Sequence, residues 1–245
     1  MRKIQLVLVA LIVLILSAFK ADHVITIYMI GDSTMSNKPL EGNNQERGWG
    51  HVLGSFFTED VRVENHAMNG RSSKSFIDEG RWETVVNKIR PGDYVFIQFG
   101  HNDEKPQPER HTDPGTTFDE NLRKFVRETR AKGGIPVLFN SIVRRNFGVN
   151  PDAVAADDIR PEKDEAVVEG DTLIDTHGKY LESPRNVAKE MDVCFIDLNQ
   201  ATKKLVESYG VEGSKKLFMW IPADTYAACP KGRQDNTHLN IYGAR

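Results

Sequence analysis

Short apolar runs rich in β-branched residues alternate with segments of helical periodicity along most of this chain of 245 residues. The runs predict strands at 24–30, 61–63, 94–99, 136–141 and 193–198. The segments between and after them predict helices at 47–57, 76–90, 117–132, 177–191 and 201–209. The run 94–99 has almost no polar alternation, which is typical of a strand covered on both faces. The pattern therefore predicts one domain in which helices cover both faces of a parallel sheet.

The first residues of the chain predict a signal peptide rather than part of the fold. A basic start, Arg2-Lys3, is followed by an apolar stretch at 4–16 and by small residues at 17 and 18. We therefore expect cleavage after 1–18, a mature chain of 19–245 in the periplasm or outside the cell, and no membrane partner after cleavage. An uncleaved membrane anchor is the alternative.

Charge and cysteine content narrow the classes of partner. The net charge is −3, and loss of the basic start makes it more negative. A mildly acidic protein has no field that attracts nucleic acid, and an anionic substrate would have to be held by local arginines. Cys194 and Cys229 can form a disulfide in an oxidising compartment or remain two free thiols. Neither cysteine has companions at metal-ligand spacing, so no metal site is expected.

Polar motifs follow the predicted strands, at the edge of a parallel sheet where ligands bind. Ser33 comes directly after the first strand, in Gly31-Asp32-Ser33, where a hydroxyl can act as a nucleophile. Gly70 lies in the loop after the second strand and offers a backbone N–H without a side chain in the way. Asn102 follows the third strand in Gly100-His101-Asn102-Asp103, and its amide can donate to a developing oxyanion.

Asp235 and His238 complete the predicted site near the end of the sequence. Their spacing of three lets a carboxylate and an imidazole share one face of a turn. Asp235 can then hold the imidazole while His238 takes a proton from Ser33. Each motif alone also reads as an ordinary turn, helix cap or polar tail. Their order after the strands is what predicts Ser-His-Asp catalysis, with oxyanion donors from the Gly70 backbone and the Asn102 side chain.

These motifs resemble the four conserved blocks of the SGNH (GDSL-type) hydrolases. Further segments resemble the rhamnogalacturonan acetylesterases within that superfamily: Arg47-Gly48-Trp49-Gly50, Asn69-Gly70-Arg71-Ser72-Ser73, Arg90-Pro91-Gly92-Asp93, Asp175-Thr176-His177-Gly178 and Asp235-Asn236-Thr237-His238. The resemblance runs from about residue 24 to 245. The family pattern continues into a terminal helix beyond Arg245, so we expect this C-terminal helix to be missing.

The resemblance implies a flavodoxin-like three-layer α/β/α sandwich with a five-stranded parallel sheet. It implies the same roles for Ser33, His238 and Asp235, and oxyanion donors from Ser33, Gly70 and Asn102. It also implies that no metal or organic cofactor takes part, and that the substrate is an acetylated pectic polysaccharide or oligosaccharide.

Residues outside these blocks are candidates for holding the substrate. Arg144 and Arg145 follow the fourth strand, and one of them can pair with a galacturonate carboxylate; two solvated arginines are the alternative. Trp220 is either a stacking platform for a sugar ring or a buried core residue. The acidic, irregular stretch 146–171 reads as an insertion near a binding face.

The sequence thus predicts a secreted carbohydrate O-acetylesterase acting on pectic rhamnogalacturonan. The alternatives are an acetylxylan esterase, or a lysophospholipase or thioesterase of the same superfamily, although no long apolar stretch is present to line an acyl-chain groove. A non-catalytic carbohydrate-binding protein is the alternative from another class. The oligomeric state stays open.

Overall fold

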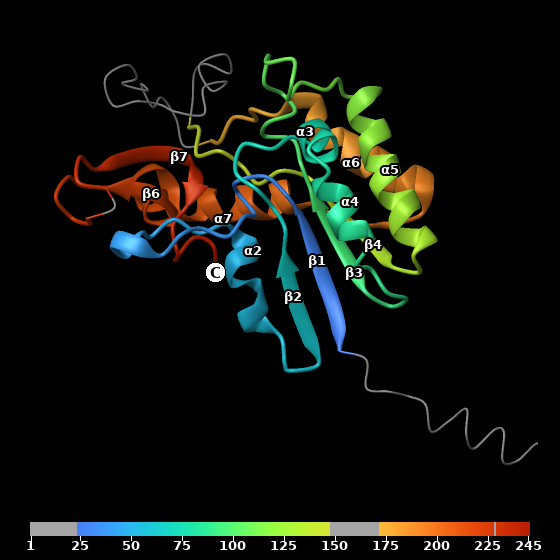
Figure 1. Ribbon diagram of the computed structural model, residues 1–245. Coiled ribbons are helices and arrows are strands. Elements are labelled where there is room, and N and C mark those ends of the chain that lie inside the picture. Colours follow the sequence, from blue (N-terminus) through green and yellow to red (C-terminus); the bar gives the residue numbers. More distant parts are fainter. Residues whose placement is uncertain (1–23, 148–171, 228) are drawn as a thin grey trace, which may run out of the picture.

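The computed structural model describes residues 24–147, 172–227 and 229–245 (Figure 1). The predicted signal peptide at 1–18 lies outside these residues, as does nearly all of the predicted insertion at 146–171. Within the described ranges, no helix combines the length and apolar character needed to cross a membrane.

A parallel sheet forms the middle layer of the fold. In the described part of the chain it has five strands in the order β2-β1-β3-β4-β5. Their bounds are β1 (Ile25–Gly31), β2 (Val61–Asn65), β3 (Tyr94–Gln98), β4 (Ile135–Phe139) and β5 (Cys194–Ile196). All four strand pairings are parallel, and the register places Gly31 at the end of β1 beside Gln98 at the end of β3. The predicted parallel sheet is confirmed.

Helices cover both faces of this sheet, as Figure 1 shows. One face carries α3 (Ser73–Asp78), α4 (Arg81–Val86), α5 (Thr117–Ala131) and α6 (Glu182–Met191). The other carries α2 (Trp49–Val52) and α7 (Leu198–Gly213). Single turns of 3₁₀ helix occur at Glu41–Asn43, Leu53–Phe56, Gly178–Leu181 and Ser214–Leu217. The three-layer α/β/α sandwich is therefore confirmed.

Alternation along the central strands divides the core between the two faces. Tyr28 and Ile30 of β1 pack in the cluster with α3 to α6, whereas Ile27 and Met29 pack with the residues around α2. Side chains on successive strand residues point to opposite faces, so an unbroken apolar strand fills both cores. The longest predicted helix, α5, buries Phe118 and its neighbours on the apolar face expected from their spacing.

Two predicted helices are shorter or broken in the structure. The predicted helix at 76–90 is two helices, because Gly80 between α3 and α4 has a left-handed φ of 70°. The predicted helix at 47–57 becomes α2 followed by a 3₁₀ turn. These differences leave the layer order unchanged.

A C-terminal hairpin, which the sequence patterns did not predict, lies beside α7. It consists of β6 (Phe218–Ile221) and β7 (Arg233–Leu239), paired antiparallel. Leu239 pairs with Phe218 and Gln234 with Trp220, so residues 235–238 bulge out opposite a single residue of β6. The bulge therefore presents the predicted Asp235–His238 turn from a hairpin.

Both cysteines are free thiols in the structure. Cys194 is exposed on β5, and Cys229 is half-buried in the loop between β6 and β7. Of the two alternatives left by the sequence, the structure shows the pair of thiols.

Candidate active site

Ser33 is presented by a tight turn at the end of β1. Asp32 is buried, and its Oδ1 accepts hydrogen bonds from both the backbone N–H and the hydroxyl of Thr34, each at 2.8 Å. A Cβ on Gly31 would lie 2.6 Å from the Gln98 carbonyl oxygen, so only glycine permits the close approach of β1 and β3 here. These contacts leave Ser33 half-buried at the carboxyl edge of the sheet.

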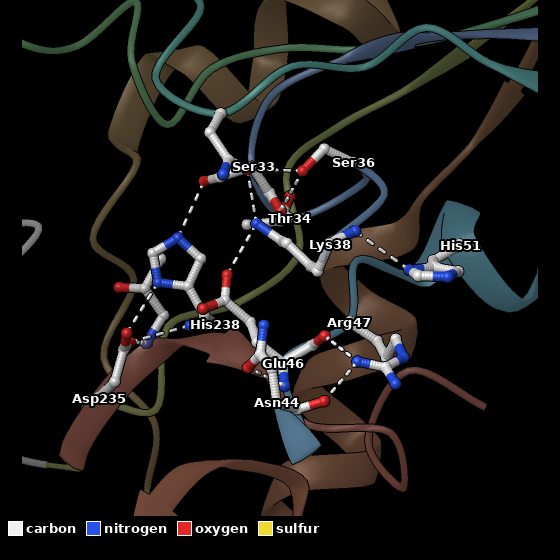
Figure 2. Close-up of polar contacts among 12 residues, drawn as sticks. Ser33, Thr34, Ser36, Lys38, Asn44, Glu46, Arg47, His51, Asp235 and His238 are labelled. Carbon is white, nitrogen blue, oxygen red and sulfur yellow. Dashed lines mark hydrogen bonds and ion pairs between the residues drawn. The ribbon is translucent and has the colours of Figure 1, made fainter. Parts of the chain in front are cut away.

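The hydroxyl, imidazole and carboxylate of the predicted triad lie in line (Figure 2). His238 Nε2 is 2.9 Å from Ser33 Oγ, and His238 Nδ1 is 2.8 Å from Asp235 Oδ2. Burial opposes ionisation of Asp235, but hydrogen bonding and charge from His238, together with the charge of Arg233, hold its pKa below the ordinary value. An ionised carboxylate only accepts, so the imidazole proton lies on Nδ1 and Nε2 is free to accept from Ser33.

The bulge in β7 fixes the orientation of Asp235. Its Oδ1 accepts from the backbone N–H of Thr237 at 2.7 Å and of His238 at 2.9 Å. Because both bonds close within the bulge, the carboxylate and the imidazole are oriented by the same four residues. The hydrogen bonds within the bulge depend on the three-residue spacing between Asp235 and His238 that is seen in the sequence.

Gly70 lies in a loop that is tied to the Ser33 turn. The Met68 N–H donates to the Gly31 carbonyl at 2.9 Å, and Asn69 Oδ1 accepts from Ser36 Oγ at 2.6 Å. Gly70 has a left-handed φ of 74°, and no atom lies within 4 Å of the place a Cβ would take. The space on the Cβ side of Gly70 is therefore open, next to the nucleophile turn, and the predicted role of its N–H as an oxyanion donor stays a prediction.

Asn102 is buried at the start of the loop after β3, with 2% of its surface exposed. Its Nδ2 donates to the Arg71 carbonyl at 3.2 Å, and its Oδ1 lies 3.4 Å from Arg110 Nη1. The amide nitrogen carries two hydrogens, so the predicted oxyanion role of the second is compatible with this bond.

Asp103 joins the loops that carry Gly70 and Asn102. Its carboxylate accepts from the Ser73 backbone and hydroxyl, from the Thr112 hydroxyl and from the Gly100 N–H. Burial raises the pKa of Asp103 to about 7 against these donors. The Asp103 side chain thus holds the loop after β2, which carries Gly70, and the loop after β3, which carries Asn102, together by hydrogen bonds.

The remaining predicted substrate residues are engaged inside the protein. Arg144 is 2% exposed and forms an ion pair with Glu104. Arg145 is 3% exposed; its Nη1 lies 3.1 Å from Asn236 Oδ1 in the β7 bulge, and its guanidinium lies 4.9 Å from the Trp220 ring. The solvated alternative is therefore wrong for both arginines, and their binding of substrate stays a prediction.

Trp220 is half-buried and packs against the apolar cluster that contains Val206 and Phe218. Its Nε1 donates to Asn236 Oδ1 at 2.9 Å, and the Lys215 ammonium lies 4.6 Å from its ring. Trp220 thus supports the bulge that carries Asp235, and sugar stacking on it also stays a prediction.

The sequence patterns did not identify three charged residues next to the triad. Lys38, Glu46 and Arg233 form consecutive ion pairs that end on Asp235. Two weak signals were present: Glu46 directly precedes the Arg47-Gly48-Trp49-Gly50 segment, and Arg233 lies two residues before Asp235. Neither signal indicates the Glu46–Arg233 pair, because these two residues are 187 positions apart in the chain.

Comparison with known proteins identifies the family. A parallel α/β sandwich with a hydroxyl, an imidazole and a carboxylate in line at its strand ends has the geometry of a serine hydrolase. Residues 29–244 match the model of the GDSL-like lipase/acylhydrolase family. The chain belongs to this family and is an esterase.

Individual relatives agree with this family. The chain is 40% identical over 220 residues to rhamnogalacturonan acetylesterase RhgT of Bacillus subtilis, covering 90% of this chain and 84% of the relative. The crystal structure of Bacillus subtilis YxiM matches with a TM-score of 0.69 and 27% identity, over 90% of this chain and about half (52%) of that structure. An acetylxylan esterase structure, Axe2 of Geobacillus stearothermophilus, shares the fold with a TM-score of 0.56 and 17% identity, over 90% of this chain and 89% of that one.

Proposed function

We propose that this protein is a secreted acetylesterase that removes acetyl groups from pectic rhamnogalacturonan by a Ser-His-Asp mechanism. The observation that carries the proposal is the line of contacts from Ser33 Oγ to His238 at 2.9 Å and from His238 to Asp235 at 2.8 Å. The name of the relative RhgT, at 40% identity, supports both the acetyl ester and the pectic polymer. The basic and apolar start of the sequence supports secretion.

The first half of the reaction uses the proton acceptor at His238 Nε2. Ser33 Oγ attacks the acetyl carbonyl carbon while its proton moves to His238. Negative charge then develops on the carbonyl oxygen, where the backbone N–H groups of Ser33 and Gly70 and the amide of Asn102 donate to it. The C–O bond to the sugar breaks, and the sugar oxygen takes the proton from His238.

The second half regenerates the enzyme. A water molecule gives a proton to His238 and attacks the acetyl group on Ser33. The same donors stabilise the second tetrahedral oxyanion. Collapse of this intermediate releases acetate and returns the proton to Ser33, while Asp235 keeps the imidazole oriented throughout.

The proposal is tested by acetate release from two polymers. The 19–245 chain and its Ser33→Ala variant are incubated with acetylated rhamnogalacturonan and with acetylated xylan. We expect release from the pectic polymer that disappears in Ser33→Ala, whose thermal unfolding midpoint stays that of the parent. Release from xylan alone would refute the pectic substrate. No release from either polymer by a folded parent would refute the enzymatic proposal and favour a carbohydrate-binding role.

A further inference from the structure

A chain of alternating charges lies behind the proposed active site. The Lys38 ammonium is 2.7 Å from Glu46 Oε1, and Glu46 Oε2 is 2.5 Å from Arg233 Nη1. Arg233 Nη2 in turn lies 2.5 Å from Asp235 Oδ2. The exposed side-chain fractions are 2% for Lys38, 13% for Glu46 and 31% for Arg233. We call these three residues the ionic chain.

The two ends of the ionic chain contact different parts of the site. At one end Lys38 Nζ donates to Asn69 Oδ1 at 2.6 Å, and Asn69 directly precedes the oxyanion donor Gly70. At the other end Arg233 shares Asp235 Oδ2 with the imidazole of His238. The same three side chains therefore touch the loop of the oxyanion site and the carboxylate that orients the base.

The backbone that carries Glu46 is fixed between the same two parts. The Arg47 N–H donates to the Leu239 carbonyl, one residue beyond His238, at 3.0 Å. The Trp49 N–H donates to the Thr34 carbonyl, one residue beyond Ser33, at 2.9 Å. Figure 2 shows Glu46 reaching Lys38 from this segment, on the side where His238 lies.

Electrostatics explains why the ionic chain stays charged. Burial lowers the pKa of Lys38, but the adjacent carboxylate of Glu46 favours the ammonium form. Burial also opposes ionisation of Glu46, yet electrostatic interactions with His238, Lys38 and Arg233 outweigh it and lower its pKa. Apolar residues of similar volume commonly replace buried ion pairs without loss of stability. Stability alone therefore does not account for four charges in a row at this place.

We propose that Lys38, Glu46 and Arg233 are positioning residues for ester hydrolysis. Through Asp235 they hold the imidazole in register with Ser33, and through Asn69 they hold the Gly70 N–H, so the base and the oxyanion site keep one relative geometry. This inference rests on the proposed Ser33 chemistry. Displacements of about 1 Å in an active site can lower rates by about 10².

Three single variants test the ionic chain: Lys38→Met, Glu46→Gln and Arg233→Met. We expect kcat for 4-nitrophenyl acetate to fall by roughly tenfold to a hundredfold, with KM changed by less than about threefold, because geometry rather than binding is lost. The control is Arg123→Met, which removes an arginine paired with Glu190 on α6, and its kcat should equal that of the parent.

Two further variants separate positioning from folding. In Lys38→Met/Glu46→Gln no buried lysine is left unpaired, so the double variant should lose less than the product of the single losses. Arg233→Lys keeps the charge but not the two-pronged geometry, so it should recover part of the activity that Arg233→Met loses. The downfield proton resonance of His238 Nδ1–H should shift in Arg233→Met and stay unchanged in Arg123→Met.

Ser33-dependent turnover in the parent combined with unchanged kcat in all three single variants would overturn this inference and leave the proposed function intact. Losses that follow the unfolding midpoint, with the His238 resonance unmoved in folded Arg233→Met, would also overturn it. A parent without Ser33-dependent turnover would overturn the proposed function itself and the inference with it.

An independent observation concerns Arg110. Its guanidinium lies beside the proposed oxyanion donor, with Nη1 3.4 Å from Asn102 Oδ1. It is half-buried, and no acidic side chain among the described residues pairs with it. Neighbouring arginines are engaged: Arg71 with Glu79, and Arg144 with Glu104. A guanidinium that has no acidic partner among the residues described, at the site of a mildly acidic protein, is suited to a carboxylate.

We infer that Arg110 binds a uronate carboxylate of the substrate next to the acetylated sugar, an inference that deepens the proposed function and rests on it. The test compares kcat/KM on acetylated rhamnogalacturonan oligosaccharides with the value on the same oligosaccharides after carboxyl reduction. The parent and Arg123→Gln should prefer the carboxylate form by about tenfold or more, the size of one charge-assisted hydrogen bond. Arg110→Gln should lose this preference.

The ratio cancels any effect of Arg110 on the position of Asn102, because both substrates carry the same ester. An equal preference in the parent and Arg110→Gln would refute the role of Arg110 and leave the pectic substrate in place. A parent inactive on both oligosaccharides would refute the proposed function instead.

Discussion

Replacing Asp235 by asparagine changes one atom at the point where four donors converge. Oδ1 accepts from the N–H groups of Thr237 and His238 at 2.7 and 2.9 Å. Oδ2 accepts from His238 Nδ1 at 2.8 Å and from Arg233 at 2.5 Å. An asparagine places an oxygen at one of these two positions and an N–H₂ group at the other. The two donors at the N–H₂ position then lose their acceptor, because an N–H₂ group can only donate.

The hydrogen bonds lost in each case decide the orientation of the asparagine amide. With the N–H₂ group at the Oδ1 position, the buried N–H of Thr237 and the part-buried N–H of His238 lose their acceptor, at about 1–3 kcal/mol for a buried group. With the N–H₂ group at the Oδ2 position, the backbone bonds survive, and Arg233 keeps Glu46 as a partner at 2.5 Å. The second arrangement is therefore favoured, and it donates to His238 Nδ1.

That arrangement reverses the imidazole tautomer. His238 must then accept at Nδ1 and carry its proton on Nε2, which points at Ser33 and can no longer take the hydroxyl proton. The same exchange in a Ser-His-Asp triad lowers kcat by about 10⁴. At about 1.36 kcal/mol per factor of ten, this corresponds to roughly 5.4 kcal/mol of transition-state stabilisation.

The assay is steady-state hydrolysis of 4-nitrophenyl acetate by the parent, Asp235→Asn and a control, Asp197→Asn. Asp197 caps α7 and accepts from the Gln200 N–H, a role that asparagine retains, so the control should keep the parent kcat. Folding is checked by circular dichroism and thermal unfolding. A folded Asp235→Asn protein with more than about a tenth of the parent kcat would refute the tautomer argument.

Three further predictions follow from the geometry. Asn102→Ala should lower kcat on the order of 10² to 10³ with little change in KM, measured on 4-nitrophenyl acetate, because one oxyanion donor is removed; an equal loss in kcat/KM through KM alone would contradict this role. Gly48→Ala should lower the free energy of unfolding in urea by about 3 kcal/mol or more, because its Cβ would lie 2.3 Å from the Met35 carbonyl carbon. Gly54→Ala, with its Cβ 3.8 Å from Val63, is the control and should stay within about 1 kcal/mol of the parent. For pH, the native pKa of Asp103 of about 7 lies above the unfolded value, so the native state retains a proton that the unfolded state loses. The unfolding free energy of the parent minus that of Asp103→Asn should therefore fall as pH rises from about 4 to about 7 and then level off; a difference that rises over this range would show that the hydrogen bonds to Asp103 outweigh its burial.

The central sheet was predictable because its signals are local. Each strand of the sheet is a short apolar run, and burial on both faces removes the polar alternation that would mark an exposed face. The turn at Ser33 and the bulge at Asp235–His238 are also local, since their hydrogen bonds close within a few residues. Motif order then placed the site at the carboxyl edge of the sheet.

The hairpin and the ionic chain were not predictable, because the sequence carries no local signal for them. β7 has the sequence RQDNTHL, which contains neither the apolar run nor the apolar–polar alternation typical of a strand. Glu46 and Arg233 are separated by 187 positions, and a single sequence carries no sign of their pairing. Arg145 likewise looked like a surface residue at a strand end, whereas Trp220 and Asn236 of the hairpin cover it. The break at Gly80 was easier to predict, because a glycine inside a helical pattern indicates a possible change in φ.

The central claim is that Ser33, activated by His238, is the nucleophile. The most direct measurement is covalent labelling with diethyl 4-nitrophenyl phosphate, followed by intact mass and peptide mapping. We predict one diethylphosphoryl group on the peptide that contains Ser33, in step with the loss of acetate release, with no label in Ser33→Ala and much slower labelling in His238→Ala. Inactivation with the label on another residue, or full acetate release by the labelled Ser33 protein, would contradict the account.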